Sequence, residues 1–502
     1  MTISSHLPIN ETELLALKER YESAGQGHVF RFFDELEGEQ QAQLVTQLLE
    51  INVEHLKEIC EKVTESAQAA SANKDAAVEP LPESVFASVL KADAEQLKAW
   101  ETIGLTNIAQ GKVAVILMAG GQGSRLGSSD PKGCYNINLP SKKSLFQLQA
   151  ERILRLQDIA RKYSEDDQTS KCIIPWYIMT SGPTNGPTID FFEKNKYFGL
   201  DKKNVMFFEQ GTLPCLTMDG KIMLEAKHKV GVAPDGNGGI YGAVHSKGVI
   251  SSLKERGILY SHCYCVDNCL ARVADPVFVG YSIDKKTDCG VKVVRKADPK
   301  EPVGVVCLRD GKYGVVEYSE ISQELSEKRQ DDGSLAFCAA NIANHFFSTE
   351  FLERVPDFVS QLEYHIAKKK IKYIDDNGEL VEPKTNSGMK LERFVFDVFS
   401  FAQAFSVLEV DRLDEFSPLK NAPGSASDCP ETSRRDIIAQ HVRFIENAGG
   451  KVEYDGGFEE LDFELSPLVS YSGEGLEEII KGKTIKTPAI IETREDLIRL
   501  AF

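Results

Sequence analysis

An α/β fold with a Rossmann-like, mixed and mainly parallel sheet is predicted by three features of this sequence. Short apolar runs alternate with helical stretches between residues 112 and 296, which is typical of βαβ units. The run KVAVILMA (112–119) is continuously apolar and ends in glycines, as expected of a buried strand that leads into a tight turn. The flanking regions lack this pattern, so we expect a helical region before the sheet and a small β-rich region after it.

The N-terminal region is predicted to be helical. Apolar residues recur there at helical spacing with charges between them, and a break at 34–39 indicates several helices. The small, polar and proline-containing stretch 67–83 is predicted to be a loop or linker.

The strands of the central sheet are predicted from apolar runs. They are 112–119, 173–179, 204–210, 259–268 and 289–296. Beyond residue 402 the composition changes, and the alternating, glycine-rich stretch 449–491 favours short strands. The predicted domains are therefore a helical domain at 1–103, an α/β domain at 104–402 and a β-rich domain at 403–502.

Composition excludes several function classes. The chain has 502 residues, of which 42% are hydrophobic and 27% are charged, as in ordinary globular proteins. Its formal net charge of −18 argues against a general nucleic-acid binder. We expect no membrane span and no signal peptide. Eleven scattered cysteines without a leader indicate reduced thiols and a cytoplasmic location.

The stretch VAVILMAGGQGSRLGSSDPKG (113–133) carries the strongest chemical signal. Glycines after a strand allow backbone N–H groups to approach phosphate oxygens, and Arg125 and Lys132 add positive charge nearby. The P-loop pattern does not fit, because Gly133 follows Lys132. The dinucleotide fingerprint does not fit either, because Leu126 occupies the position of its last glycine. A tight strand-to-helix connection is the structural alternative.

Taken whole, LMAGGQGSRLG followed by DPKG resembles the sugar-1-phosphate uridylyltransferase signature L-x-x-GG-x-G-T-R-LG-x-x-x-PKG, with Ser124 in place of threonine. Further stretches occur in the order of the eukaryotic UDP-N-acetylglucosamine pyrophosphorylases, which the chain closely resembles. They include GQGHVFRFFDEL (25–36), FFEQGTLPC (207–215), APDGNGGIY (233–241), CVDN (265–268), ANIANHFF (340–347), MKLERFVFDVF (389–399) and FSPLKNA (416–422).

The resemblance implies a nucleotidyltransferase core and one reaction. UTP and N-acetylglucosamine-1-phosphate would give UDP-N-acetylglucosamine and pyrophosphate, by in-line attack of the sugar phosphate on the α-phosphorus. Such an enzyme needs no side-chain nucleophile, and instead brings two polyanions together and stabilises the charge of the transition state. Mg²⁺ is the implied cofactor. No nucleic-acid or membrane partner is expected, and the oligomeric state is left open.

The resemblance also implies roles for individual residues. The nucleotide ligands would be Met118, Ala119, Gly120, Gly121, Gly123, Lys132, Gln210, Gly236, Asp267 and Lys390. The sugar-phosphate ligands would be Asn237, Gly238, Glu317, Tyr318, Asn341, Phe394, Phe396 and Lys420. Arg125, Lys132, Lys390 and Lys420 would be the catalytic cations, and Asp267 would hold the metal.

Several alternatives stay open from the sequence. For Asp267 the alternative is a turn or capping aspartate, and for Phe394 and Phe396 it is a role as ordinary core aromatics. Cys263, Cys265 and Cys269 have no zinc-site spacing and are predicted to be core thiols. A UDP-glucose or broad-range UDP-sugar pyrophosphorylase and a catalytically silent UDP-sugar sensor are the competing functions.

Overall fold

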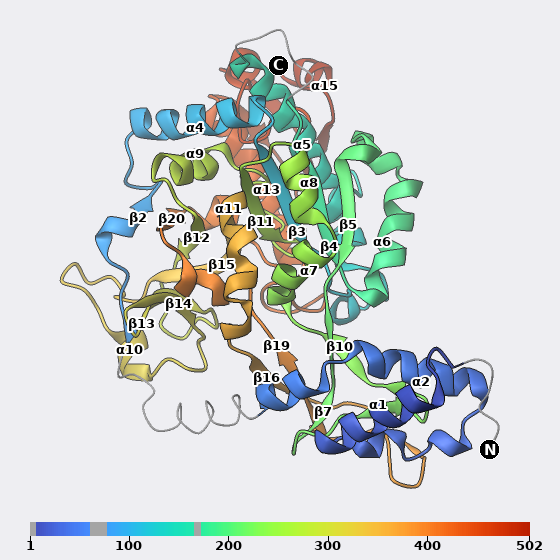
Figure 1. The fold of residues 1–502 in the computed structure, drawn as a ribbon. Helices are drawn as coiled ribbons and strands as arrows, with labels where there is room; N and C mark the ends of the chain where they lie inside the picture. Colours follow the sequence, from blue (N-terminus) through green and yellow to red (C-terminus); the bar gives the residue numbers. More distant parts are fainter. Residues whose placement is uncertain (1–6, 61–77, 165–171) are drawn as a thin grey trace. The chain divides into compact units, whose positions relative to one another are not determined.

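The computed structural model describes residues 7–60, 78–164 and 172–502. Its chain divides into two compact units, each assembled from separate segments of the sequence. Unit 1 contains 1–76, 210–240 and 360–397, and unit 2 contains 77–209, 241–359 and 398–502. Figure 1 shows the elements of both.

Unit 2 is built on a sheet of eleven strands in its described part. Its main path, in spatial order, is β2 (Phe86–Ser88), β20 (Phe405–Val410), β12 (Cys289–Arg295), β15 (Ala339–Ser348), β11 (Tyr260–Cys265), β3 (Val113–Met118), β4 (Trp176–Thr180) and β5 (Val205–Glu209) (Figure 1). Only β15 on this path runs antiparallel to its neighbours. The predicted mixed, mainly parallel sheet is therefore confirmed, and the five predicted strands are β3, β4, β5, β11 and β12.

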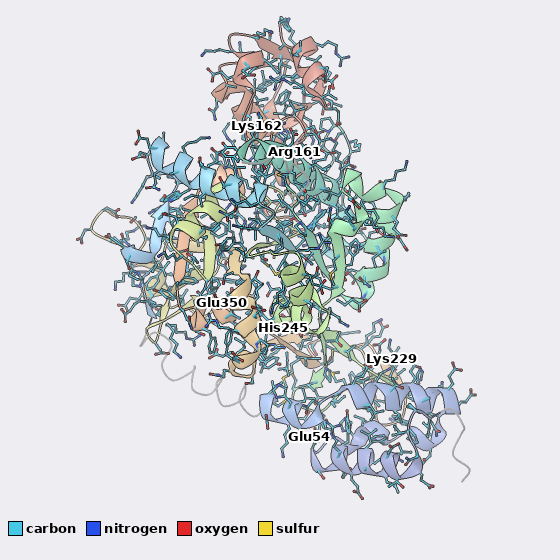
Figure 2. The ribbon with its side chains drawn as sticks, turned by 45° about the horizontal axis from the view of Figure 1, so that its top comes forward. Glu54, Arg161, Lys162, Lys229, His245 and Glu350 are labelled. Atoms are coloured by element: carbon cyan, nitrogen blue, oxygen red, sulfur yellow. The ribbon has the colours of Figure 1, made fainter. Side chains whose placement is uncertain are left out.

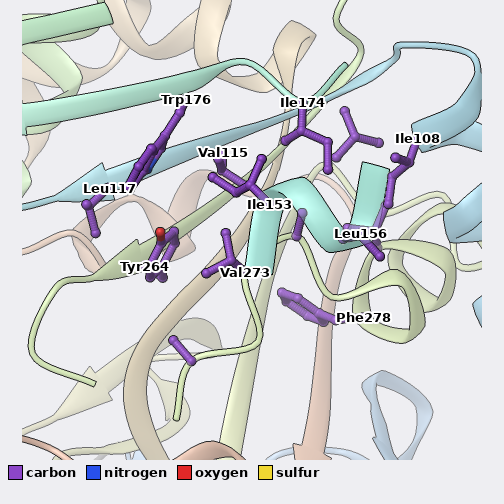
Figure 3. Close-up of a cluster of buried hydrophobic side chains, with 14 of the residues drawn as sticks. Ile108, Val115, Leu117, Ile153, Leu156, Ile174, Trp176, Tyr264, Val273 and Phe278 are labelled. Carbon is purple, nitrogen blue, oxygen red and sulfur yellow. The ribbon is translucent and has the colours of Figure 1, made fainter. Parts of the chain in front are cut away.

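The core of unit 2 explains why β3 reads as a continuous apolar run. All six residues of β3 are buried, because helices cover both faces of a parallel sheet. Figure 3 shows part of this core, in which Val115 and Leu117 of β3 lie near Trp176, Ile153 and Tyr264. The strand is thereby held rigidly at the point where its glycine turn begins.

Helices α4 (Ala94–Ala109) and α9 (Pro276–Asp284) pack closely in unit 2. Glycines make the approach possible: a Cβ on Gly104 would lie 2.0 Å from the Pro276 carbonyl oxygen. Because α4 belongs to this core, the predicted boundary between 103 and 104 falls inside a helix. The structure divides the chain elsewhere.

The C-terminal region contains the expected β elements, in two parallel pairs. β21 (Lys451–Glu453) pairs with β23 (Thr484–Lys486), and β22 (Phe463–Leu465) pairs with β24 (Ala489–Ile491). Three helices accompany them: α13 (Pro430–Asn447), α14 (Glu477–Ile480) and α15 (Arg494–Leu500).

These C-terminal elements share a core with other parts of unit 2. Their apolar side chains pack with Leu126, Ile137 and Leu148, which lie in or near the glycine-turn region. Strand β20, which begins at Phe405, lies inside the central sheet. The division predicted between 402 and 403 therefore differs from the observed one, in which 398–502 belongs to unit 2.

Unit 1 combines the N-terminal helices with small sheets from later in the chain. α1 (Glu11–Ser23) and α2 (Gly38–Glu50) confirm the helical N-terminal region. Their apolar faces pack on β7 (Leu216–Thr217) and β19 (Gly388–Glu392), which form a sheet with β16 (His365–Lys369). Because residues 1–76 pack on segments that are distant in sequence, they belong to unit 1. The rest of the predicted domain 1–103 belongs to unit 2.

The predicted linker 67–83 lies largely outside the described residues. Its described end contains β1 (Val78–Glu79), which pairs with β13 (Val305–Arg309). The remaining longer elements are α5 (Leu145–Ala160), α6 (Gly182–Lys194), α7 (Ile240–Ser246), α8 (Val249–Glu255), α10 (Gln323–Glu327), α11 (Thr349–Arg354), α12 (Arg412–Glu415) and β14 (Lys312–Val316).

Short strands complete unit 1. They are β6 (Thr212–Pro214), β8 (Leu224–Ala226), β9 (Lys229–Val230), β10 (Val232–Pro234), β17 (Tyr373–Ile374) and β18 (Leu380–Val381). Figure 2 shows the side chains, including the exposed Lys162 and Glu350 of unit 2. Among the described helices, none combines the length and the apolar character that crossing a membrane requires.

Candidate functional site

The glycine turn begins where β3 ends and closes on itself. The Gly123 N–H donates to the Asp130 carbonyl (2.9 Å), and the Lys132 N–H donates to the Gly121 carbonyl (3.1 Å). Met118 and Ala119 are buried, and the Gly120 carbonyl accepts from the Ser181 hydroxyl at 2.7 Å. A Cβ on Gly121 would meet no described atom within 4 Å, so protein packing does not require glycine there. Close approach of a ligand would require it.

Lys132 lies beside Asp267, although 135 residues separate them in sequence. The two come together because β3 and β11 are parallel neighbours that end in register, with Met118 opposite Cys265. The Lys132 Nζ atom is 3.7 Å from Asp267 Oδ2 and donates a 3.1 Å hydrogen bond to the Leu419 carbonyl. The structure therefore brings together three chain segments at the carboxyl edge of the sheet, where open parallel sheets bind ligands.

Lys420 is the next residue after Leu419 in the chain, and it is exposed. Its backbone N–H donates to the Asp428 carbonyl at 2.7 Å, which ties the loop 420–428 together. Burial raises the pKa of the Cys265 thiol, and the charges of Asp267, Lys132 and Lys420 all lie near enough to affect it. Arg125, on the short helix Ser124–Leu126, is also exposed. Lys132, Asp267 and Lys420 thus form one predicted group of phosphate-side residues that the fold assembles.

Glu317 and Asn341 meet around Gly304. The Asn341 N–H donates to the Gly304 carbonyl at 2.9 Å, and a Cβ on Gly304 would lie 2.9 Å from Glu317 Oε1. Asn341 lies at a β-bulge of β15, where its Oδ1 accepts from the Ala343 N–H at 3.0 Å. The Nδ2 group of Asn341 is then the part of the amide that could donate a hydrogen bond to a ligand. Tyr318 is 55% exposed and lies in the turn after β14.

In unit 1, two loops are held together by backbone hydrogen bonds. The Arg393 N–H donates to the Asp235 carbonyl, and the Gly238 N–H donates to the Arg393 carbonyl, both at 2.8 Å. Gly236 has φ of +86°, and a Cβ there would lie 2.3 Å from the Arg393 carbonyl oxygen. Gln210 donates to the Gly236 carbonyl over 3.4 Å. The predicted nucleotide ligands Gln210 and Gly236 are therefore adjacent.

The predicted sugar-side residues of unit 1 adjoin the same loops. Asn237 Oδ1 accepts from the Val395 N–H at 2.9 Å, so its Nδ2 group remains to donate. The rings of Phe394 and Phe396 lie 5.1 Å apart. Phe394 also contacts the His365 ring, with a centroid distance of 4.3 Å and an angle of 33° between the ring planes. Phe396 is buried, as the core alternative requires, whereas Phe394 is half-buried. Lys390 lies on β19, paired in register with Ala367.

Sequence reasoning missed a buried ion pair under these loops. Arg393 Nη2 lies 3.7 Å from Asp235 Oδ2, and the Arg393 guanidinium also lies 4.8 Å from the Tyr364 ring centroid. Burial raises the pKa of Asp235 to about 6, although the Arg393 charge opposes that rise. In the sequence, Asp235 directly precedes the GNGG motif (236–239), and this acidic residue was the signal that could have pointed to the pair. Its partner was hidden, because Arg393 lies 158 positions later in the chain.

The structure thus gathers the predicted residues into separate groups. Unit 2 holds the glycine turn, Arg125, Lys132, Asp267, Lys420, Glu317, Tyr318 and Asn341, and unit 1 holds Gln210, Gly236, Asn237, Gly238, Lys390, Phe394 and Phe396. Their roles toward ligands stay predictions. All eleven cysteines are free thiols, and the described residues contain no group of three metal-ligating side chains.

These features define the class of this protein: an α/β protein with a glycine turn and a lysine–aspartate pair at the carboxyl edge of a mainly parallel sheet. The chain belongs to the UTP–glucose-1-phosphate uridylyltransferase family, whose profile matches residues 53–451. The resemblance found in the motifs is therefore confirmed at the level of the family.

Relatives match nearly the whole chain. It is 46% identical to the UDP-N-acetylhexosamine pyrophosphorylase-like protein 1 of Xenopus tropicalis, over 95% of this chain and 96% of that protein. It is 43% identical to the UDP-N-acetylglucosamine pyrophosphorylase of Saccharomyces cerevisiae, over 94% and 98% of the two chains. Its fold matches the crystal structure of the uridine diphosphate N-acetylglucosamine pyrophosphorylase of Trypanosoma brucei with a TM-score of 0.79, 31% identity and coverage of 94% and 95%.

Proposed function

We propose that this protein is a uridylyltransferase that makes UDP-N-acetylglucosamine and pyrophosphate from UTP and N-acetylglucosamine-1-phosphate. A phosphate oxygen of the sugar phosphate forms a bond to the α-phosphorus of UTP. The bond from that phosphorus to the oxygen bridging to the β-phosphate breaks, and pyrophosphate leaves with the bonding electrons. The names of the relatives support the substrate, and the site supports the chemistry.

The observation that carries the proposal is the placement of Lys132. Its ammonium lies at the mouth of a glycine turn, tied to the Leu419 carbonyl and 3.7 Å from Asp267. A cation held in this way needs little reorganisation when negative charge develops on a leaving pyrophosphate. Exposed Arg125 and Lys420 supply further mobile charge for the same polyanions. No Ser/His/Asp nucleophile set is required by this chemistry.

A divalent metal fits the residues present. Asp267 is a carboxylate with a 24% exposed side chain, two residues after the end of the buried strand β11, and the Lys132 Nζ atom lies 3.7 Å from its Oδ2. Mg²⁺ usually takes one or two protein carboxylates and completes its shell with substrate phosphates and water. Asp267 would hold the ion, and the ion would neutralise phosphate charge. Lys132 and the backbone N–H groups of the turn would bind and orient the phosphates themselves.

Amide donors would recognise the sugar. In both Asn237 and Asn341, Oδ1 accepts a hydrogen bond from a backbone N–H of the protein, so Nδ2 would be the donor to the sugar. Hydroxyl oxygens and the acetamido carbonyl are acceptors of the required kind. Glu317 provides acceptor oxygens for sugar hydroxyls. The partners of this protein are then UTP, N-acetylglucosamine-1-phosphate and their products, and we propose that it acts in the cytoplasm.

A pyrophosphate-release assay tests the proposal. UTP is combined with the 1-phosphates of N-acetylglucosamine, N-acetylgalactosamine, glucose and galactose, each with and without Mg²⁺. We expect N-acetylglucosamine-1-phosphate to have a higher kcat/KM than glucose-1-phosphate. We also expect pyrophosphate release to require Mg²⁺. A tenfold preference for glucose-1-phosphate would favour a UDP-glucose enzyme. Binding of UDP-N-acetylglucosamine without any pyrophosphate release would favour a sensor.

A further inference from the structure

One buried asparagine, Asn268, joins the loop after β11 to the segment that leads to Lys420. Its Nδ2 donates to the Glu415 carbonyl at 2.7 Å, and its Oδ1 accepts from the Ser417 N–H at 3.0 Å. The same Oδ1 accepts from the Leu270 N–H at 3.2 Å. Asn268 is only 3% exposed, so water does not replace these partners.

Backbone bonds continue the same junction. The Leu419 N–H donates to the Asp267 carbonyl at 2.8 Å, and the Cys269 N–H donates to the Ser417 carbonyl at 3.0 Å. Asn268 and Pro418 form an antiparallel bridge. Since the Leu419 carbonyl is the acceptor for Lys132 Nζ, the position of the Lys132 ammonium depends on this junction.

We propose that Asn268 is a positioning residue for uridylyl transfer, which fixes the segment 415–419 against the Asp267 loop and so places the ammonium groups of Lys132 and Lys420. The proposal rests on the proposed function. Asn268 touches neither phosphate nor metal in this role. It acts through the carbonyl of Leu419 and through the course of the chain into Lys420.

The side chain at this position must donate and accept at once. Asn268→Asp keeps the oxygen that accepts from Ser417 and Leu270 but places a second oxygen against the Glu415 carbonyl. Two acceptors then face each other in a buried place, which forces the segments apart. A shift of about 1 Å in a catalytic arrangement costs on the order of 10²-fold in rate.

The test compares Asn268→Asp with a matched variant, Gln440→Leu. Gln440 is also a buried amide and donates to the carbonyl of Asp414 at 2.6 Å, but it holds α13 to α12 rather than the Asp267 loop. We expect Asn268→Asp to lower kcat for pyrophosphate release at least tenfold, whereas Gln440→Leu keeps kcat within twofold at a similar loss of Tm. Equal kcat in both variants would overturn the proposal.

A double-mutant cycle with Lys132→Ala separates positioning from general damage. Since Asn268 acts in part through Lys132, Asn268→Asp should lower kcat by a smaller factor in the Lys132→Ala background than in the wild-type background. A full multiplicative loss would contradict the proposal. If Asn268→Asp fails to fold, Ser417→Ala tests the same segment, because the Ser417 hydroxyl donates a 2.8 Å hydrogen bond to Asp436 on α13. We then expect Ser417→Ala to lower kcat by more than Gln440→Leu does. An inactive wild-type protein would instead overturn the proposed function.

Discussion

The Lys132 ammonium and the Asp267 carboxylate lie 3.7 Å apart at the ends of two parallel strands that are neighbours in the sheet. At this distance the pair is a loose ion pair, and both side chains keep some exposure, 18% for Lys132 and 24% for Asp267. The phosphates of a bound polyanion would interact with the Lys132 ammonium, and a divalent cation would interact with the Asp267 carboxylate. The pair therefore links the glycine turn to the candidate metal position.

Replacing Lys132 is expected to affect turnover far more than stability. Lys132→Ala should slow pyrophosphate release by about 10²–10³, the usual cost of removing one preorganised electrostatic contact. Steady-state kinetics and thermal unfolding measure the two effects separately. Lys162→Ala, at an exposed lysine labelled in Figure 2, is the control and should change neither. A folded Lys132→Ala protein with wild-type activity would remove Lys132 from the mechanism.

Asp267→Asn should abolish Mg²⁺-dependent turnover with little loss of Tm. The amide keeps the size of the side chain, and the Leu419 carbonyl still accepts from Lys132. A neutral amide oxygen is a far weaker ligand for Mg²⁺ than a carboxylate. Titration of both proteins with Mg²⁺ in the activity assay checks this prediction. An unchanged metal requirement would mean that other residues hold the metal.

Asn341 should affect the sugar phosphate rather than UTP. Asn341→Ala leaves a substrate acceptor unpaired, which costs roughly 1–3 kcal/mol, or about five- to 150-fold in kcat/KM for the sugar phosphate. Asn341→Asp separates this effect from damage to the β-bulge, because its carboxylate still accepts from the Ala343 N–H. Both variants should leave the KM for UTP nearly unchanged. Equal impairment toward the two substrates would instead indicate a disturbed fold.

Buried histidines predict loss of stability in mild acid. Burial lowers the pKa of His262 to about 4 and those of His345 and His441 to about 3, below the ordinary 6.5. The unfolded chain therefore binds protons that the folded chain does not. Stability is fully present above pH 6.5 or so and falls progressively as pH falls toward about 4.

His345→Phe tests this pH dependence. Neither ring nitrogen of His345 has a hydrogen-bond partner among the described residues, and the ring lies between Phe347 and Phe399. Phenylalanine keeps the ring and removes the titration. Tm measured from pH 7.5 to 4.5 should fall less steeply in the variant, with similar stability at neutral pH. Identical pH profiles would show that His345 does not contribute.

The contact of α4 with α9 should not tolerate a methyl group. Gly104→Ala places a Cβ 2.0 Å from the Pro276 carbonyl oxygen, and overpacking of this kind costs about 1–3 kcal/mol. Gly242→Ala, in α7, is the control, because its Cβ would meet no described atom within 4 Å. Thermal unfolding should show a lower Tm for Gly104→Ala alone. An unchanged Tm would mean that the helices separate without cost.

From the sequence alone, five strands of the central sheet and the glycine turn could be predicted. The run at 113–118 is apolar at every position because both faces of β3 are covered, so the strand and its end could be predicted locally. The motif residues were found in the same way, since each lies in a short contiguous pattern. Their assignment to phosphate or sugar came from resemblance and stays a prediction.

Which of these residues meet depends on the tertiary fold. The pairing of Lys132 with Asp267 and the Leu419 carbonyl depends on strand order and on a backbone atom, and neither leaves a mark in local composition. The Asp235–Arg393 pair was missed for the same reason, and the division of the chain into two units also depends on contacts between distant segments. Periodicity reports the burial of a residue, which is a local property, whereas contacts between distant segments depend on how the whole chain closes on itself.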